Sequence, residues 1–314
     1  MPAPARPTTT LTPLPAGAAL PTQALNPSLF ANPAVLGGLA LALTVAIWAG
    51  FFISLRAGAR AHLAPAELAL IRFLPAGLVF APVLWRRRER FAALPLRLWL
   101  SIVAGAGLPY FLVAGTGMRH APVVDGSTLI PGTIPLFVAL LAAAAQGRQA
   151  LSRWPALLMI GSGVATLLAW HHGEGELAQG YALFLLGSLM WANYTLALRA
   201  AKLAPVEAAA LISCVSLLLL APWLIWHPPL GLLALPASQF WLHLGLQGLG
   251  VGLVSTLSYS YAIARLGAQR AATGGALAPV LAALLAMPVF GEFPDSASVI
   301  GMVLIIAGVI WSQR

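Results

Sequence analysis

Two stretches of this sequence repeat one pattern: "WAGFFISLRAGARAHLAPAE" at 48–67 and "WANYTLALRAAKLAPVE" at 191–207. Each begins with Trp-Ala, continues through Leu-Arg-Ala and ends with Leu-Ala-Pro-X-Glu. The first two of these landmarks return after 143 positions. The pattern indicates that one structural unit is encoded twice in this chain.

Three further landmarks keep nearly the same spacing. Gly-X-Gly at 105–107 returns at 248–250, "PLFVALLAA" at 135–143 returns as "PVLAALLAM" at 279–287, and Ile-Gly at 160–161 returns at 300–301. An apolar sequence of low complexity readily gives one such coincidence, but not four in one register. We therefore predict a genuine duplication.

The composition is typical of an integral membrane protein. Of the 314 residues, 60% are hydrophobic and only 8% are charged, whereas a soluble domain has roughly 25% charged residues. The net charge of +9 does not indicate nucleic-acid binding, because the cations lie between apolar runs rather than beside a soluble core. A single cysteine, Cys214, allows no intramolecular disulfide and no cysteine-based metal site. The sequence has no P-loop and its histidines lack metal-ligand spacing, so we expect no cofactor and no metal.

A helix needs about 20 mostly apolar residues to cross a bilayer. Ten such runs are present, at 34–55, 66–85, 98–118, 122–146, 154–170, 180–200, 206–226, 239–264, 271–290 and 297–312. Segment 1–33 is rich in Pro, Thr and Ala, and we predict that it is a disordered tail. The two repeats then occupy 34–170 and 180–312, joined by a loop at 171–179. The predicted fold is all-α, with ten transmembrane helices.

The positions of Arg and Lys predict the orientation, because these residues favour the cytoplasmic side. With the N-terminus in the cytoplasm, the other side receives only Arg56, Arg60 and Arg119. Both termini are therefore expected to be cytoplasmic. Five helices are an odd number, so the second repeat enters the membrane inverted, as in secondary transporters with a central cavity and alternating access. The cations on the cytoplasmic side are Arg6, Arg86, Arg87, Arg88, Arg90, Arg97, Arg148, Arg153, Arg199, Lys202, Arg265, Arg270 and Arg314.

These residues resemble the EamA-type transporters of the drug/metabolite transporter superfamily over about 34–312. The resemblance rests on Trp48, on "LALIRF" at 68–73, on the prolines of "PLFVALL" and "APVLAALL", on "FGE" at 290–292 and on "IGMVLIIAGV" at 300–309. It implies export of amino acids, aromatic or other neutral ones, or of related small metabolites, across a bacterial inner membrane. The chain departs from the family where Gly147-Arg148 stands in place of a counterpart to Gly291-Glu292, which weakens any role for a symmetric pair of carboxylates.

Arg72 is the first candidate for substrate contact. It lies about 10 Å into the second run at 1.5 Å per residue, and intramembrane charges usually face an interior or a cavity. A guanidinium is also suited to hold a carboxylate through two parallel hydrogen bonds. Alternatively, Arg72 extends toward the surface or bonds to carbonyls of a neighbouring helix. The equivalent residue of the second repeat is Ile212, so this feature is one-sided.

Aromatic and small polar residues form the second group of candidates. A cavity with aromatic walls and a few polar groups suits a zwitterion with a flat apolar side chain. Interfacial aromatic belts are the alternative, and we favour this alternative for Tyr259 and Tyr261. Besides Arg72, the substrate-binding candidates are Trp48, Phe51, Tyr110, Trp191, Asn193, Tyr194 and Ser258.

Prolines and glycines are candidates for helix kinks and gating. Proline interrupts helical hydrogen bonds, and glycine allows helices to approach closely. Ordinary tight packing needs the same residues, so both interpretations remain open. The candidates are Pro109, Pro131, Pro135, Gly248, Gly252 and Pro279.

The acidic residues divide into two groups. Glu67 and Glu207 each follow a proline by two positions, which predicts helix N-terminal caps, and Glu292 with Asp295 indicates a polar turn. Asp125 is a candidate for proton coupling, or it pairs near the outer surface.

We expect a secondary transporter, and not an enzyme, whose partners are a small-molecule substrate and the lipid bilayer. Two paired repeats can form a complete pathway, so a monomer suffices. Efflux of lipophilic cations is the alternative, although it calls for a carboxylate in the membrane and only Asp125 is available. An intramembrane hydrolase using Ser162 lacks a suitably placed base, and a structural scaffold is the remaining alternative.

Overall fold

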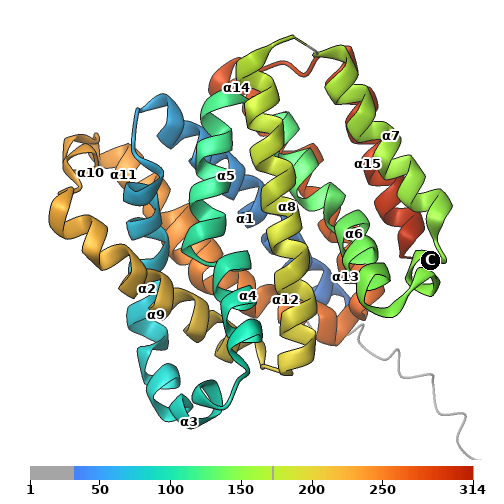
Figure 1. Ribbon diagram of the computed structural model, residues 1–314. Helices are drawn as coiled ribbons and strands as arrows, with labels where there is room; N and C mark the ends of the chain where they lie inside the picture. The colour runs from blue at the N-terminus through green and yellow to red at the C-terminus, as the bar shows by residue number, and fades with distance from the viewer. Residues whose placement is uncertain (1–31, 172, 314) are drawn as a thin grey trace, which may run out of the picture.

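The computed structural model describes residues 32–171 and 173–313, which form an all-helical bundle (Figure 1). Apart from its last two residues, the predicted N-terminal tail lies outside the described part. The elements, in order, are α1 (Pro33–Arg60), α2 (Pro65–Arg86), α3 (Arg88–Ala92), α4 (Leu96–Ala106), α5 (Leu108–His120), α6 (Val123–Gln146), the 3₁₀ turn η2 (Arg148–Leu151), α7 (Trp154–Trp170), α8 (Gly175–Ala201), α9 (Pro205–Trp226), α10 (Leu230–Ala234), α11 (Ala237–His243), the π-helix η3 (Leu244–Val254), α12 (Ser255–Leu266), α13 (Ala268–Gly275), α14 (Ala278–Phe290) and α15 (Ser296–Ser312).

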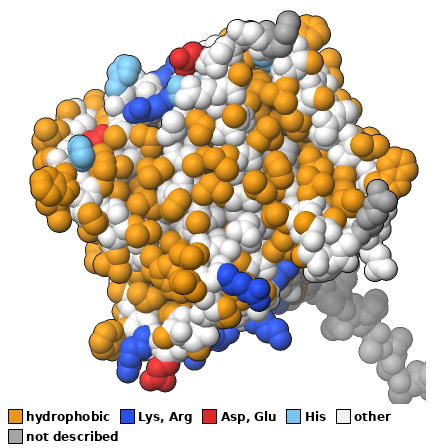
Figure 2. Space-filling model, in the orientation of Figure 1, with side chains coloured by type: hydrophobic (Ala, Val, Ile, Leu, Met, Phe, Trp, Pro, Cys, Tyr) orange, Lys and Arg blue, Asp and Glu red, His pale blue; other side chains and the backbone are white. Residues whose placement is uncertain are grey.

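Within the described residues, eight helical segments are long and apolar enough to cross a membrane. They are Pro33–Arg60, Pro65–Arg86, Leu96–His120, Val123–Gln146, Gly175–Ala201, Pro205–Trp226, Ala237–Leu266 and Gln269–Phe290. Two shorter apolar helices, α7 and α15, coincide with the remaining predicted runs. Apolar side chains cover most of the visible surface, and Lys and Arg gather mainly at one end (Figure 2). The chain is a multi-pass membrane protein.

The repeated Leu-Ala-Pro-X-Glu phrase starts a helix in both places. The Glu67 carboxylate accepts a hydrogen bond from the N–H of Ala64 at 2.8 Å, and Glu207 accepts one from Ala204 at 2.9 Å. Each carboxylate satisfies an N–H that a helix start leaves free. The cap predicted for both glutamates is confirmed. Shortly before each start the backbone takes a left-handed turn, at His62 (φ 57°) and Lys202 (φ 51°).

Several helices differ from the predicted spans at their ends or in their interior. α1 continues to Arg60, and α8 already begins at Gly175, inside the segment predicted as the loop between the repeats. The third span is broken at Gly107, which separates α4 from α5 just before Pro109. The ninth is broken between α13 and α14, where Pro279 lies in the first turn of α14. The eighth contains the π-helix η3, which the sequence pattern did not indicate.

Small residues bring helices from the two halves of the chain together. A Cβ atom at Gly105 of α4 would lie 2.4 Å from the carbonyl oxygen of Met190 in α8. α7 and α15 approach in the same way, because a Cβ atom at Gly163 would lie 2.8 Å from the carbonyl oxygen of Gly301. These contacts bring α4 close to α8 and α7 close to α15.

This packing predicts opposite effects for two glycines of α7. Gly163→Ala should destabilise the protein by about 1–3 kcal/mol, because its methyl group overlaps a backbone oxygen that cannot move aside. Gly161→Ala is the matched control, since its Cβ atom would meet nothing within 4 Å. There the loss of glycine flexibility should stabilise the helix by about 0.5–1 kcal/mol. Thermal unfolding in detergent measures both, and equal melting temperatures would contradict the described α7–α15 contact.

Candidate functional site

A cavity of about 700 Å³ lies in the middle of the bundle. Its volume falls in the range of about 300–1,000 Å³ that is usual for small-molecule sites. It is lined from α1, α2, α5, α6, α7, α8, η3 and the segments from α12 to α15. The lining therefore combines residues from both halves of the chain.

The cavity opens at the end of the bundle where the cations gather. We call this end the basic face; it carries Arg86, Arg87, Arg88, Arg90, Arg97, Arg153, Arg199, Lys202, Arg265 and Arg270. Arg153, Arg199 and Gln313 line the mouth there, at helix ends. The opposite face carries Arg56, Arg60, Arg119, Glu67, Glu174, Glu176, Glu292 and Asp295.

The cavity ends blindly before it reaches the opposite face. Its deepest lining residues include Phe52, Arg72 and Thr128, of which Phe52 and Thr128 are buried. At 1.5 Å per residue, Arg72 lies about 10 Å from the start of α2 and Thr128 about 8 Å from the start of α6. The structure is thus open to the basic face and closed to the opposite face.

Arg72 supplies an isolated positive charge to this blind end. Its Nη1 donates one long hydrogen bond, 3.4 Å, to the carbonyl of Gln247, and the guanidinium lies 5.7 Å from the Phe73 ring centre. No ion pair with Arg72 occurs among the described residues. The guanidinium of Arg72 therefore has further N–H donors with which to bind a ligand in the cavity.

Aromatic rings form the walls around Arg72. Tyr110 and Trp191 pack with ring centres 5.0 Å apart, and Trp48 packs with Tyr259 at 4.9 Å. Phe51 is a further aromatic lining residue. The structure therefore brings together five predicted substrate-binding candidates: Trp48, Phe51, Arg72, Tyr110 and Trp191.

Three predicted candidates do not line the cavity. Asn193 is exposed on α8, which corrects its prediction as a substrate-binding residue. Tyr194 packs behind Trp191 at 5.2 Å, and Ser258 shares a 2.8 Å hydrogen bond with Thr44 of α1. These two side chains support neighbouring elements rather than the cavity surface.

Some of the predicted gating residues line the cavity and others do not. Pro131, Pro135 and Pro279 line the cavity, whereas Pro109 lies behind the break at Gly107. Gly248 and Gly252 of η3 pack against the backbone of α2: Cβ atoms there would lie 2.8 Å from the carbonyl oxygen of Ile71 and 3.3 Å from that of Arg72. Their position serves close packing next to Arg72, and a role in gating stays a prediction.

Four lining residues were missed or interpreted otherwise from the sequence. Tyr259 faces the cavity rather than an interfacial belt, and Arg153 and Arg199 line the mouth. Thr128 is 1% exposed, and its hydroxyl has no hydrogen-bond partner among the described residues. Thr128 lies one turn beyond Asp125 on α6, which was the available signal.

Asp125 lies outside the cavity, in a buried polar cluster near the opposite face. Its carboxylate accepts hydrogen bonds from the hydroxyls of Tyr181 at 2.8 Å and Ser298 at 2.7 Å. His171, which bonds to Asp295 at 2.8 Å, lies 3.3 Å from the Tyr181 hydroxyl. The cluster adjoins a shallow hollow of about 610 Å³ on the opposite face.

The His171–Asp295 pair favours its charged form. Burial works against the charged imidazole, but the hydrogen bond to Asp295 and that to the Leu167 carbonyl raise the pKa of His171 above its usual value. Partial burial likewise opposes the Asp295 carboxylate, but bonds from the Ser298 N–H and from His171 lower its pKa. The pair therefore remains charged between these two pKa values.

Residues 178–313 match the model of the EamA-like transporter family. The matched segment contains α9 to α15 and most of α8, which supply about half of the cavity wall. Over this segment the chain is similar to the EamA-like transporter family, which indicates a transporter rather than an enzyme. In agreement, Ser162, the nucleophile of the hydrolase alternative, is exposed and bonds to the Met159 carbonyl of its own helix.

Two relatives and one solved structure extend this comparison. The chain is 28% identical over 284 residues to a "Probable terminal-alkyne amino-acid exporter" from Streptantibioticus cattleyicolor, covering 88% of this chain and 92% of the relative. It is 34% identical over 142 residues to "Inner membrane protein YtfF" from Escherichia coli, covering 40% of this chain and 43% of that protein. A crystal structure that is 21% identical, with a TM-score of 0.57, covers 88% of this chain and 96% of that chain, which shows a shared fold.

The unpartnered hydroxyl of Thr128 gives a test of the site. Thr128→Val should leave the free energy of unfolding unchanged or raise it slightly, because no hydrogen bond is lost. Thr133→Val, on the same helix, should cost about 1 kcal/mol, because Thr133 bonds to Ser188 and to the Leu129 carbonyl. Thermal unfolding in detergent compares the two, and a larger loss for Thr128→Val would mean that its hydroxyl is held by the protein.

Proposed function

We propose that this protein is a secondary transporter that exports amino acids or related small metabolites by alternating access. The observation that carries the proposal is the central cavity, whose aromatic walls surround Arg72, a partly buried charge with no ion-pair partner among the described residues. An amino acid brings a carboxylate for Arg72 and, in the aromatic and neutral cases, a side chain for the walls. The relative named as an amino-acid exporter supports the same substrate class.

We further propose that the bundle consists of two inverted five-helix repeats. The contacts support this, because a two-fold axis would interchange the pair α5–α8 with the pair α12–α1. The same axis would relate α2 to α9 and α7 to α15, and both of these pairs are in contact. α2 and α9 run in opposite directions, since Arg90, just after α2, donates to Glu207 and to the Lys202 carbonyl at the start of α9.

The orientation follows from the distribution of charge. The basic face should lie in the cytoplasm of a bacterial cell, with both termini on that side of the inner membrane. The cavity then opens to the cytoplasm, where an exporter collects its substrate. The relative named as an inner membrane protein supports this location.

The cavity lining disfavours the alternative of cation efflux. Among the described lining residues there are three arginines, Arg72, Arg153 and Arg199, and no aspartate or glutamate. A lipophilic cation would meet only positive charge there, whereas a carboxylate is attracted throughout.

The direct test is counterflow in proteoliposomes. Labelled threonine, methionine, phenylalanine and tryptophan would be compared with an organic cation, without an ion gradient. We expect accumulation of amino acids and not of the cation. Accumulation of the cation alone would contradict the proposal.

Arg72 provides the first variant to test. Arg72→Gln should reduce counterflow at least tenfold, because a neutral amide loses the charge that holds the substrate carboxylate. Thr128→Val should give a smaller loss, and Glu176→Gln, an exposed change on the opposite face, should give none. Unchanged transport by Arg72→Gln would remove Arg72 from the binding site.

Asp125 provides the test for proton coupling, which we propose as a secondary feature of the transporter. Its buried carboxylate, next to a hollow on the opposite face, is placed to exchange a proton with that side. Asp125→Asn should abolish accumulation driven by a pH gradient but retain counterflow, because only the former needs proton release. Equal sensitivity of wild type and variant to the gradient would show that Asp125 carries no coupled proton.

A further inference from the structure

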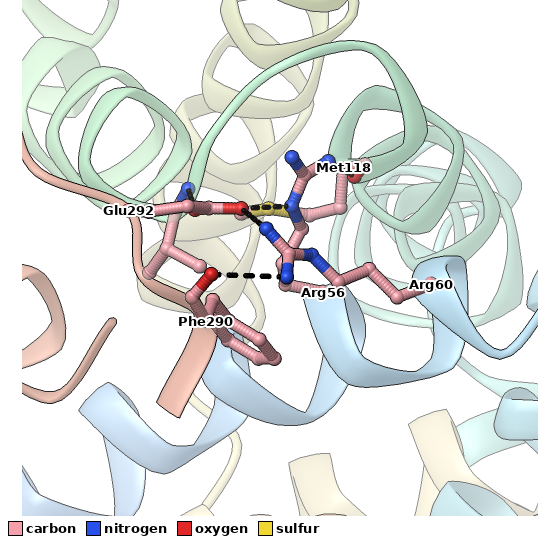
Figure 3. Close-up of polar contacts among 6 residues, drawn as sticks. Arg56, Arg60, Met118, Phe290 and Glu292 are labelled. Atoms are coloured by element: carbon pink, nitrogen blue, oxygen red, sulfur yellow. Dashed lines mark hydrogen bonds and ion pairs between the residues drawn. The ribbon is translucent and has the colours of Figure 1, made fainter. Parts of the chain in front are cut away.

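The closed end of the cavity is held by one carboxylate, that of Glu292 (Figure 3). Glu292 lies between α14 and α15 with its side chain only 13% exposed. Its Oε1 accepts hydrogen bonds from Nε of Arg56 at 2.7 Å and from Nη2 of Arg60 at 2.9 Å. Its Oε2 accepts one from the backbone N–H of Val123 at 3.0 Å. A carboxylate ligand that is bound tightly by a protein accepts hydrogen bonds from the same kinds of donors.

The two arginines extend the cluster to further helix ends. Arg56 also donates to the carbonyl of Met118, at the end of α5, at 2.7 Å. Arg60 donates to the carbonyl of Phe290 at 3.1 Å, with its guanidinium 4.9 Å from the Phe290 ring centre. One carboxylate thus joins the ends of α1, α5, α6 and α14 on the opposite face (Figure 3).

This cluster lies directly beyond the blind end of the cavity. On α1, Arg56 is one helical turn after Phe52, which lines the blind end. On α6, Val123 is five residues before Thr128, which lines it as well. A substrate moving from Arg72 to the opposite face must therefore pass between the helix ends that Glu292 ties together.

The other end of the cavity differs in charge. The repeat register places Arg199 opposite Arg56 and Arg148 opposite Glu292. Arg199 makes no ion pair with any residue that the structure describes. Arg199 lines the open mouth of the cavity, in agreement with this difference.

We propose that Arg56, Arg60 and the N–H of Val123 form a carboxylate-binding site on the exit path, and that Glu292 occupies this site to keep the exit closed. Two guanidinium groups face a single carboxylate, so the site keeps an excess of positive charge. A substrate carboxylate that leaves Arg72 is the chemical group able to replace Glu292 and open the exit. This step rests on the proposed function, whereas the closure itself does not.

The closure can be tested without any substrate. A Thr128→Cys reporter, in a Cys214→Ala background, would be treated with a membrane-impermeant thiol reagent added to intact cells. With Glu292 present, labelling should be slow, because the reporter is reached only from the basic face. Glu292→Ala should speed labelling several-fold, since the helix ends lose their common partner.

The carboxylate site is tested by chemical rescue of the same variant. Acetate should slow the labelling of Glu292→Ala toward the original rate, because its carboxylate fits between Arg56, Arg60 and Val123. Acetamide, which has the same shape without the charge, should not slow it. Arg60→Gln provides a milder second variant, since Arg60 is 46% exposed, and it should give a smaller increase in labelling. Glu176→Gln, an exposed acid on the same face, should give no increase.

Each outcome separates the possibilities. Slow labelling of both Glu292→Ala and Arg60→Gln, with the proteins folded, would overturn the closure. Fast labelling that acetate and acetamide affect equally would overturn the carboxylate site. The expected labelling together with no amino-acid counterflow would leave the closure standing and reject the proposed substrate class alone.

Discussion

The burial of one guanidinium constrains the structure around the cavity. Arg72 is partly buried inside the bundle, and a charge in such a place is tolerated only where polar groups surround it. The contact between α2 and η3 provides such a group, because Gly248 and Gly252 let the two backbones approach and the Gln247 carbonyl accepts from Arg72. Gln247 is itself held through its side chain, which donates to the Phe51 carbonyl on α1. π-helical turns often occur at functional sites, and here the turn joins the two helices that carry Arg72 and Phe51.

Features that depend on near neighbours in the sequence were predictable. The apolar runs, the caps at Glu67 and Glu207 and the segregation of arginines to one end follow from composition, spacing and local hydrogen bonding. The partners of Glu292 were not predictable, because they lie 169 to 236 positions away in the chain. By local rules, "FGE" followed by Phe-Pro-Asp predicts a polar turn. Only the packing of α14 against α1 and α6 makes its carboxylate the link between four helix ends.

The site was predicted in part, and helix geometry explains the errors. Trp191 and Asn193 were both proposed to face the substrate, yet two residues on an α-helix point about 200° apart at 3.6 residues per turn. The structure places Trp191 and Thr195, one turn apart, on the cavity side and Asn193 on the exposed side. Tyr259 was ambiguous for another reason. Its helix α12 carries small polar residues on several sides (Ser255, Thr256, Ser258 and Ser260), so its sequence does not separate a lipid-facing from a cavity-facing position.

In the proposed repeat arrangement, a symmetric frame with asymmetric chemistry gives the protein a preferred resting state. If two inverted repeats were identical, the states open to either face would have equal free energies. The Glu292 cluster, which closes one end of the cavity, removes this equality. Its strength matters: exposed ion pairs contribute about 0.2–1 kcal/mol, whereas removing one partner of a buried pair costs about 3–5 kcal/mol. Glu292 is mostly buried and Arg60 is half exposed, which places the closure between these limits. A bias of a few kcal/mol keeps one end closed for most of the time. It is also small enough for a ligand with differential affinity for the two states to reverse, as alternating access requires.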